Sequence, residues 1–221
     1  MNLKLLITVI KTDKPVREDA SRLRGYIGNK FKEYLLLHHH IEENENLYAY
    51  PRIQYKIIEN TPMIVGIEDG VEVLKKISDD LKELKLGKNN YKILSIQMNQ
   101  INAEFGKCRD NIYYRFLLPW LALNQKNYKK YREIKDWKEK KDFLNRILVG
   151  NVLSMCKSLD YIVIGKLYTH SLLNEERVKY KGVFCNAFTG EFKINFKIPD
   201  YIGIGKGVSH GFGTIKRIKN D

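Results

Sequence analysis

Side chains that can move protons are concentrated in one stretch of this 221-residue chain. His38, His39 and His40 are consecutive, with Lys30 before them and Tyr48 after them. Histidine exchanges protons near neutral pH, tyrosine can donate a proton, and lysine supplies a positive charge that stabilises a developing anion. The stretch therefore predicts a general acid–base centre.

Backbone geometry limits which of these histidines can act together. Successive residues of an extended chain point to opposite sides, so His38 and His40 would share one face and His39 would point away. This arrangement permits a base–acid pair of His38 and His40, assisted by Lys30 and Tyr48. Which histidine is the base and which is the acid stays open.

The same histidines allow other interpretations, namely metal binding or a solvated loop without a role. Two histidines with a nearby carboxylate suit a transition metal, and the histidine stretch is followed by glutamates. The sequence has no pair of histidines four residues apart, the spacing that places two ligands on one helix face. We therefore expect neither a metal nor another cofactor. The alternative is a metal-dependent nuclease that uses His38, His40 and one of Glu42, Glu43 and Glu45.

A glycine-rich segment lies near the end of the sequence, from Gly203 to Gly213. It holds five of the 15 glycines of the protein. Glycine lets the backbone approach a ligand closely and adopt positive φ, and successive N–H groups can form an anion site. The alternative is a loop whose glycines serve only tight turns. The predicted phosphate contacts are Gly203, Gly205, Lys206, Gly207, His210, Gly211 and Gly213.

The charge balance indicates a polyanionic partner. The chain has 39 Lys and Arg against 26 Asp and Glu, a net charge of +13. Neutralising nucleic-acid phosphates releases counterions and so gives affinity that does not depend on sequence. A surface adapted to heat or salt, or a basic ribosome-associated protein, would show the same balance.

Cysteine usage and hydropathy exclude several classes. Cys108, Cys156 and Cys185 are odd in number and far apart, which disfavours a disulfide framework or a zinc site. We expect a reducing, cytoplasmic location. No run approaches the roughly 20 apolar residues of a membrane helix, so no membrane partner is expected.

Two further basic surfaces are candidates for RNA. In residues 126–146, lysines and arginines are interleaved with Tyr128 and Tyr131, a pattern that suits single strands because bases stack on rings. Acidic residues in the same run predict equally well a solvated helix face with ion pairs. A second surface lies on the first predicted helix. The predicted contacts are Lys129, Lys130, Arg132, Arg22 and Arg24.

Alternating and helical hydrophobic patterns predict the elements that position these residues. The first part reads strand, helix, strand, strand, helix, strand, which is the ferredoxin-like order. Those elements are expected at residues 3–11, 13–34, 52–58, 63–67, 68–84 and 91–98. In the second part we expect strands at 112–118, 161–167, 180–188, 191–198 and 214–218, a loop at 123–136 and a helix at 137–155.

Several segments together resemble a known family. The order of glycines from Gly203 to Gly213 resembles the C-terminal signature of the RAMP superfamily of CRISPR-associated proteins. The similarity is strongest to the endoribonucleases that cut CRISPR precursor RNA, the Cas six family, in forms found with archaeal and clostridial type I-B systems. Residues 50–56, 116–128, 143–148 and 198–201 also fit that family.

The resemblance implies an α+β chain of two tandem ferredoxin-like domains. Residues 1–102 would carry the catalytic centre and residues 103–221 the glycine-rich RNA-binding loop. The family places its catalytic histidine between the first helix and the next strand, which carries that role to the His38–His40 window. The common Tyr-His-Lys pattern is not reproduced here, so the roles of individual residues stay open.

The resemblance also implies a reaction and its partners. In the family, the 2′-OH of the RNA attacks the adjacent phosphorus without a metal, which gives a 2′,3′-cyclic phosphate and a 5′-OH. The expected partner is CRISPR repeat RNA, both precursor and product, and other CRISPR-associated subunits or a second copy of the chain are allowed. The rival hypothesis is a non-catalytic RAMP subunit that binds CRISPR RNA, which would need no histidine cluster.

Overall fold

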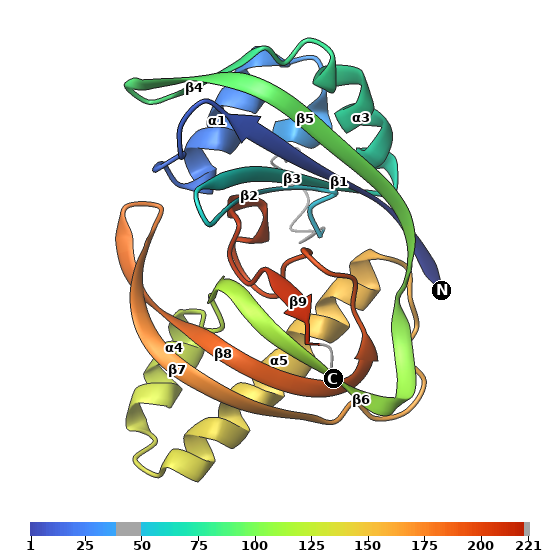
Figure 1. Ribbon diagram of the computed structural model, residues 1–221. Helices are drawn as coiled ribbons and strands as arrows, with labels where there is room; N and C mark the ends of the chain where they lie inside the picture. Colours follow the sequence, from blue (N-terminus) through green and yellow to red (C-terminus); the bar gives the residue numbers. More distant parts are fainter. Residues whose placement is uncertain (39–49, 219–221) are drawn as a thin grey trace. The chain divides into compact units, whose positions relative to one another are not determined.

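Figure 1 shows the computed structural model of the protein, which describes residues 1–38 and 50–218, His38 by its backbone alone. Contacts divide the chain into two units. The N-terminal unit comprises Asn2–Ala103 and Val208–Gly211, and the C-terminal unit comprises Met1, Glu104–Gly207 and Phe212–Asp221. In the part of the chain that is described, no helix is both long and apolar enough to cross a bilayer.

The N-terminal unit has a five-stranded sheet in the order β2-β3-β1-β5-β4. Without the edge strand β4, this is the strand order of a ferredoxin-like fold, in which the first and third strands lie at the centre. β1 pairs antiparallel with β3, and β4 pairs antiparallel with β5. The elements are β1 (Asn2–Thr12), α1 (Ala20–Lys30), α2 (Leu35–His38), β2 (Ile53–Ile58), β3 (Thr61–Ile67), α3 (Asp69–Ser78), β4 (Glu83–Leu86) and β5 (Asn89–Glu104).

The core of this unit lies between α1, α3 and one face of the sheet (Figure 1). Leu23 and Ile27 of α1 and Leu74 of α3 are buried there, because residues three and four apart share one face of a helix. They belong to one cluster with Leu6 and Tyr55 from the sheet. Burial of this apolar surface is the main stabilising contribution to the unit.

Two predicted helix boundaries in this unit were wrong. α1 begins after Asp19, whose side chain accepts a hydrogen bond from the backbone N of Arg22 at 3.1 Å, and not near residue 13. The predicted helix 68–84 ends at Ser78. Beyond it, Leu84 pairs with Tyr91 across the β4–β5 ladder, so this apolar residue packs from a strand.

The C-terminal unit has a four-stranded sheet in the order β7-β8-β6-β9, which is again the ferredoxin-like order. In place of a second crossover helix, the glycine-rich segment and the short η1 (Val208–His210) connect β8 to β9. The prediction of two ferredoxin-like folds in tandem is confirmed. The other elements are β6 (Gly106–Trp120), α4 (Gln125–Glu133), α5 (Trp137–Ser158), β7 (Thr169–Tyr180), β8 (Val183–Lys197) and β9 (Ile215–Arg217).

The hairpin of the C-terminal unit differs from the predicted one. β8 is one strand through Gly190, and the turn falls at Lys181 and Gly182, which have φ of 49° and 81°. Gly190 serves close packing, because a Cβ there would lie 2.3 Å from the carbonyl oxygen of Leu172. Residues 161–167, predicted as a strand, form none, and the predicted loop 123–136 contains the helix α4.

Replacing Gly213 by alanine should lower the free energy of unfolding by about 2–4 kcal/mol. Gly213 has a φ of +65°, and a Cβ there would lie 2.0 Å from the carbonyl oxygen of Ile204. The matched control is Gly150→Ala in α5, where a Cβ meets nothing within 4 Å. That change should stabilise the protein by roughly 0.5–1 kcal/mol.

Urea unfolding followed by circular dichroism measures both variants. A Gly213→Ala protein as stable as the unchanged one would contradict the packing described here.

Candidate functional site

The predicted acid–base stretch follows α1 in the N-terminal unit. Lys30 is the last residue of α1, and its exposed Nζ donates a hydrogen bond to the carbonyl oxygen of Asp80 at 2.6 Å. His38 ends α2, so its backbone is helical and the alternation expected for extended chain does not apply to it. His40 and Tyr48 lie outside the described residues, as do the glutamates of the metal alternative.

The C-terminal end of α2 is tied to the sheet. Tyr55 of β2 is 1 % exposed, and its hydroxyl donates to the carbonyl oxygen of Leu37 at 3.3 Å. Burial raises the pKa of Tyr55 well above its usual value, so this hydroxyl keeps its proton and remains a donor. The residue next to His38 is therefore fixed to the core of the unit.

The glycine-rich segment has structural reasons for its glycines. Gly205, Gly207, Gly211 and Gly213 all have positive φ. A Cβ at Gly205 would lie 2.5 Å from Nε1 of Trp120. The turns thus account for these glycines without a ligand, and the RNA contacts of the segment stay predictions. Its exposed residue is Lys206, whose Nζ lies 5.6 Å from the centre of the Tyr180 ring.

Two predicted RNA-binding residues contact each other in the N-terminal unit. Nη1 of Arg24 on α1 is hydrogen-bonded to Nε2 of His210 in η1. Nδ1 of His210 lies 2.9 Å from Oγ of Ser21, a residue that sequence reasoning missed. Arg22, the residue that follows Ser21 on α1, is exposed. The structure therefore brings η1 together with α1, far from it in sequence.

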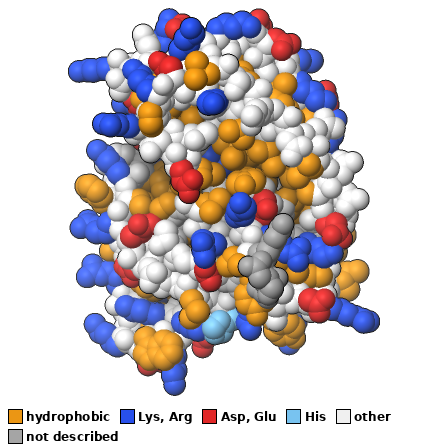
Figure 2. All heavy atoms as spheres, viewed as in Figure 1, with side chains coloured by type: hydrophobic (Ala, Val, Ile, Leu, Met, Phe, Trp, Pro, Cys, Tyr) orange, Lys and Arg blue, Asp and Glu red, His pale blue; other side chains and the backbone are white. Residues whose placement is uncertain are grey.

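The basic helix α4 presents most of its surface to solvent. Its single buried residue is Tyr131, whose hydroxyl donates to Glu175 at 2.8 Å. Lys129, Lys130 and Arg132 are exposed. Among the described residues, no salt bridge includes a side chain of residues 126–146, so the interpretation as an ion-paired helix face loses support. Figure 2 shows many Lys and Arg side chains on the face that it draws.

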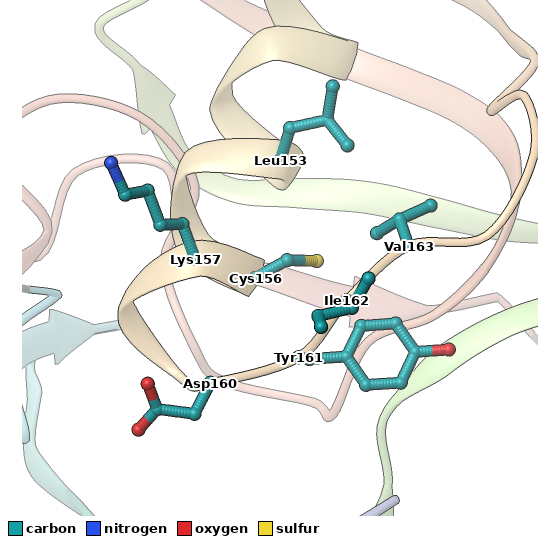
Figure 3. Close-up of a pocket in the computed structure, with 7 residues that line it drawn as sticks. All are labelled: Leu153, Cys156, Lys157, Asp160, Tyr161, Ile162 and Val163. Atoms are coloured by element: carbon teal, nitrogen blue, oxygen red, sulfur yellow. The ribbon is translucent and has the colours of Figure 1, made fainter.

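A hollow of about 490 Å³ lies at the C-terminal end of α5 and contains none of the predicted site residues (Figure 3). Burial raises the pKa of its Cys156 to about 12, so the thiol is protonated and a poor nucleophile. This hollow does not have the chemistry of a catalytic centre. It is lined by Leu153, Cys156, Lys157, Asp160, Tyr161, Ile162 and Val163.

A buried lysine in β2 also escaped sequence reasoning. Lys56 is fully buried, and its Nζ donates to Oε1 of Gln54, also fully buried, at 3.1 Å. Burial lowers the pKa of Lys56 from its ordinary 10.5 to about 7. Two polar residues alternating with Ile53 and Tyr55 could have signalled a polar contact on one face of the strand, although not its depth.

Two ferredoxin-like folds in tandem, with a glycine-rich return to the last strand, define a protein of the RAMP class. Comparison with protein families narrows the class. The profile of the Cas6b N-terminal domain matches residues 1–104, and that of the Cas6b C-terminal domain matches residues 106–218. The chain belongs to the Cas6b family.

Solved structures agree with this family, and a curated relative is similar to part of the chain. A crystal structure of Cas6b is 36 % identical with a TM-score of 0.89 over 99 % of this chain and all of that one. Another, described as the CRISPR RNA processing endoribonuclease Cas6b, is 34 % identical with a TM-score of 0.80 over the same shares. The uncharacterized protein MJ0978 of Methanocaldococcus jannaschii is 45 % identical over 141 residues, 63 % of this chain and 95 % of that protein.

Substituting Lys56 by methionine should stabilise the protein at pH 7 and flatten its stability between pH 7 and 10. In that range the unfolded chain binds a proton that the folded one lacks, so stability rises with pH. The rise from Lys56 should be roughly 2–4 kcal/mol, and below pH 7 the full cost of the buried charge remains.

Urea unfolding at pH 6, 8 and 10 tests this prediction. Lys76→Met, an exposed lysine of α3 in the same unit, is the control and should keep the slope of the unchanged protein. Equal slopes for both variants would show that Lys56 is not buried as a neutral amine.

Proposed function

We propose that the protein is an endoribonuclease that cuts CRISPR repeat RNA in the precursor transcript and so generates mature CRISPR RNA. The observation that carries the proposal is the similarity over nearly the whole chain to a solved Cas6b described as a CRISPR RNA processing endoribonuclease. The concentration of histidines after α1 supports it, because a subunit that only held RNA would need no such stretch.

The proposed reaction is a transesterification. The 2′-OH loses its proton to a base, and its oxygen attacks the adjacent phosphorus. The bond from phosphorus to the 5′ oxygen breaks, and an acid protonates that oxygen, which leaves a 2′,3′-cyclic phosphate and a 5′-OH. His38 and His40 are the proposed base and acid, Tyr48 assists, and Lys30 supplies positive charge near the phosphorane. No metal takes part in this scheme.

We further propose a division of labour along the chain. Residues 1–102 supply the cleaving groups, and residues 103–221 supply the basic helix α4 and the exposed Lys206 for RNA phosphates. The exposed cationic side chains of α4 support this assignment, since phosphate contacts need accessible positive charge. Other CRISPR-associated subunits or a second copy of the chain are compatible partners.

A 2′-deoxy nucleotide at the scissile position should abolish cleavage while RNA binding persists. The deoxy sugar lacks the attacking oxygen but keeps the phosphates that give affinity. Gel analysis of a labelled repeat RNA, with and without EDTA, provides the measurement. Cleavage of the deoxy substrate would sink the mechanism, and inhibition by EDTA would favour the metal alternative.

Histidine variants accompany that assay. His38→Ala and His40→Ala should each lower the cleavage rate by about 10²–10⁴ and keep RNA affinity. His170→Ala is the control, because His170 is exposed and its Nε2 contacts Lys141 at 2.8 Å on the C-terminal unit. A stable uncut complex with the unchanged protein would instead indicate a binding subunit.

The triple variant Lys129→Ala, Lys130→Ala and Arg132→Ala should weaken RNA binding and reduce the dependence of affinity on salt. Each lost phosphate contact lowers the slope of log K against log salt by about 0.7 for single strands. The control removes three lysines that already pair with carboxylates, Lys75, Lys85 and Lys197, and so changes the net charge equally. Equal effects of both triples would show that only total charge matters.

A further inference from the structure

The four-stranded sheet of the C-terminal unit has one apolar face and one polar face. Residues of β6 alternate between the two, since successive side chains of a strand point to opposite sides. Tyr114 and Phe116 are buried, and their ring centres lie 5.4 and 5.0 Å from that of Phe192 in β8. Tyr113 and Arg115 are exposed. The face that carries these two residues is therefore open to solvent, and we call it the open sheet face.

Strand register places the side chains of the open sheet face next to one another. Tyr113 lies opposite Lys193 of β8. Arg115, in the neighbouring row, lies between Glu191 of β8 and Lys216 of β9. Nζ of Lys193 is 5.9 Å from the centre of the Tyr113 ring. One exposed aromatic ring and three cationic side chains thus occupy two adjacent rows of the sheet.

The open sheet face carries an excess of positive charge. Arg115 is paired with Glu191, because its Nε and Nη2 lie 3.0 and 2.7 Å from Oε1. Among the described residues, neither Lys193 nor Lys216 takes part in a salt bridge. Two ammonium groups can therefore bind an anion here, on a protein whose net charge is +13.

The exposed ring decides which kind of anion fits. Tyr113 is 40 % exposed, so one aromatic surface is left in contact with water beside the lysines. Unpaired bases stack on aromatic side chains, and an aromatic residue on the face of a four-stranded sheet is one way in which proteins bind single-stranded RNA. An acidic protein segment would pair with the lysines and leave the ring without a function.

We propose that the open sheet face binds an unpaired nucleotide of the repeat RNA, with its base stacked on Tyr113 and the flanking phosphates on Lys193 and Lys216. This inference rests on the proposed function for the identity of the RNA. It adds a base contact, in a different part of the C-terminal unit, to the phosphate contacts of α4. Stacking selects unpaired RNA, because a duplex keeps its bases inside the helix.

Fluorescence anisotropy measures binding without cleavage when the labelled single-stranded repeat RNA carries a 2′-deoxy nucleotide at the scissile position. Tyr113→Ala should raise the dissociation constant about 5- to 100-fold, whereas Tyr113→Phe keeps the ring and should change it by less than about twofold. Leu172→Ala is the matched control. Leu172 lies opposite Glu191 on the same face and is 66 % exposed, but it has no ring on which a base can stack.

Duplex RNA of the same sequence separates stacking from a general loss of binding. The unchanged protein and Tyr113→Ala should bind the duplex equally well, because its bases cannot reach the ring. Equal weakening for both RNAs would overturn the proposal, as would unchanged affinity of Tyr113→Ala for the single strand. The second result would leave an acidic protein as the partner that fits the lysines.

Photo-cross-linking of the unchanged protein to repeat RNA that contains 4-thiouridine tests the contact without a substitution. Mass spectrometry should find cross-links at Tyr113 or Lys193, and cross-links confined to other peptides would contradict the proposal. An unchanged protein that binds the single strand through Tyr113 but leaves unmodified RNA uncut would refute the proposed cleavage and not this inference. If it binds no RNA, this inference fails as well.

Discussion

The return of the chain from β8 to β9 is the constraint on which the rest of the structure depends. β9 must pair with β6, where Phe116 opposes Ile215, and the chain reaches it without a helix. Irregular backbone inside a protein needs partners for its N–H groups. Gly213 donates to the carbonyl oxygen of Pro119 at 2.7 Å, and Ile204 donates to that of Gly213 at 2.9 Å. A Cβ at Gly213 would lie 2.0 Å from the carbonyl oxygen of Ile204, so this glycine is a folding requirement before it is a binding one.

The same return also supplies four residues to the N-terminal unit. The chain leaves the C-terminal unit after Gly207 and re-enters it at Phe212, and the four residues between them group with α1 and β2. Within this unit, His210 contacts Ser21 and Arg24 of α1. Residues far apart in the sequence therefore contact each other in this unit, because the backbone conformation of the glycine-rich segment decides which side chains meet.

Hydrophobic patterns predicted the elements of the first fold well where the spacing of apolar residues matches a helix or a strand. They failed where contacts with a distant strand determine the secondary structure. Leu84 continues the helical spacing of Leu74 and Ile77, so no local pattern separates it from α3, and only the ladder to β5 makes it part of a strand. Gly190 was predicted to lie in a turn, because a glycine in a strand pattern often marks one. Its actual reason is the close approach of Leu172 on the neighbouring strand, which the local sequence does not reveal.

The residue types of the candidate site could be predicted from the sequence, but their contacts with distant residues could not. Residue chemistry alone singled out the histidine stretch and the glycine-rich segment. The contact between Ser21 and His210 spans 189 positions, and no single sequence encodes such a pairing in a readable way. Tyr55 was equally hidden, because its place in an apolar strand predicts burial and not the hydrogen bond to Leu37.

The attachment of α4 through one buried tyrosine has a consequence for how the protein can change over generations. Tyr131 is the buried residue of α4, and the other side chains of the helix are not part of the core. Substitutions there cost little stability, since exposed helix positions usually tolerate exchange within about 0.5 kcal/mol. Selection can therefore retune this surface for a new ligand while the two sheets stay as they are.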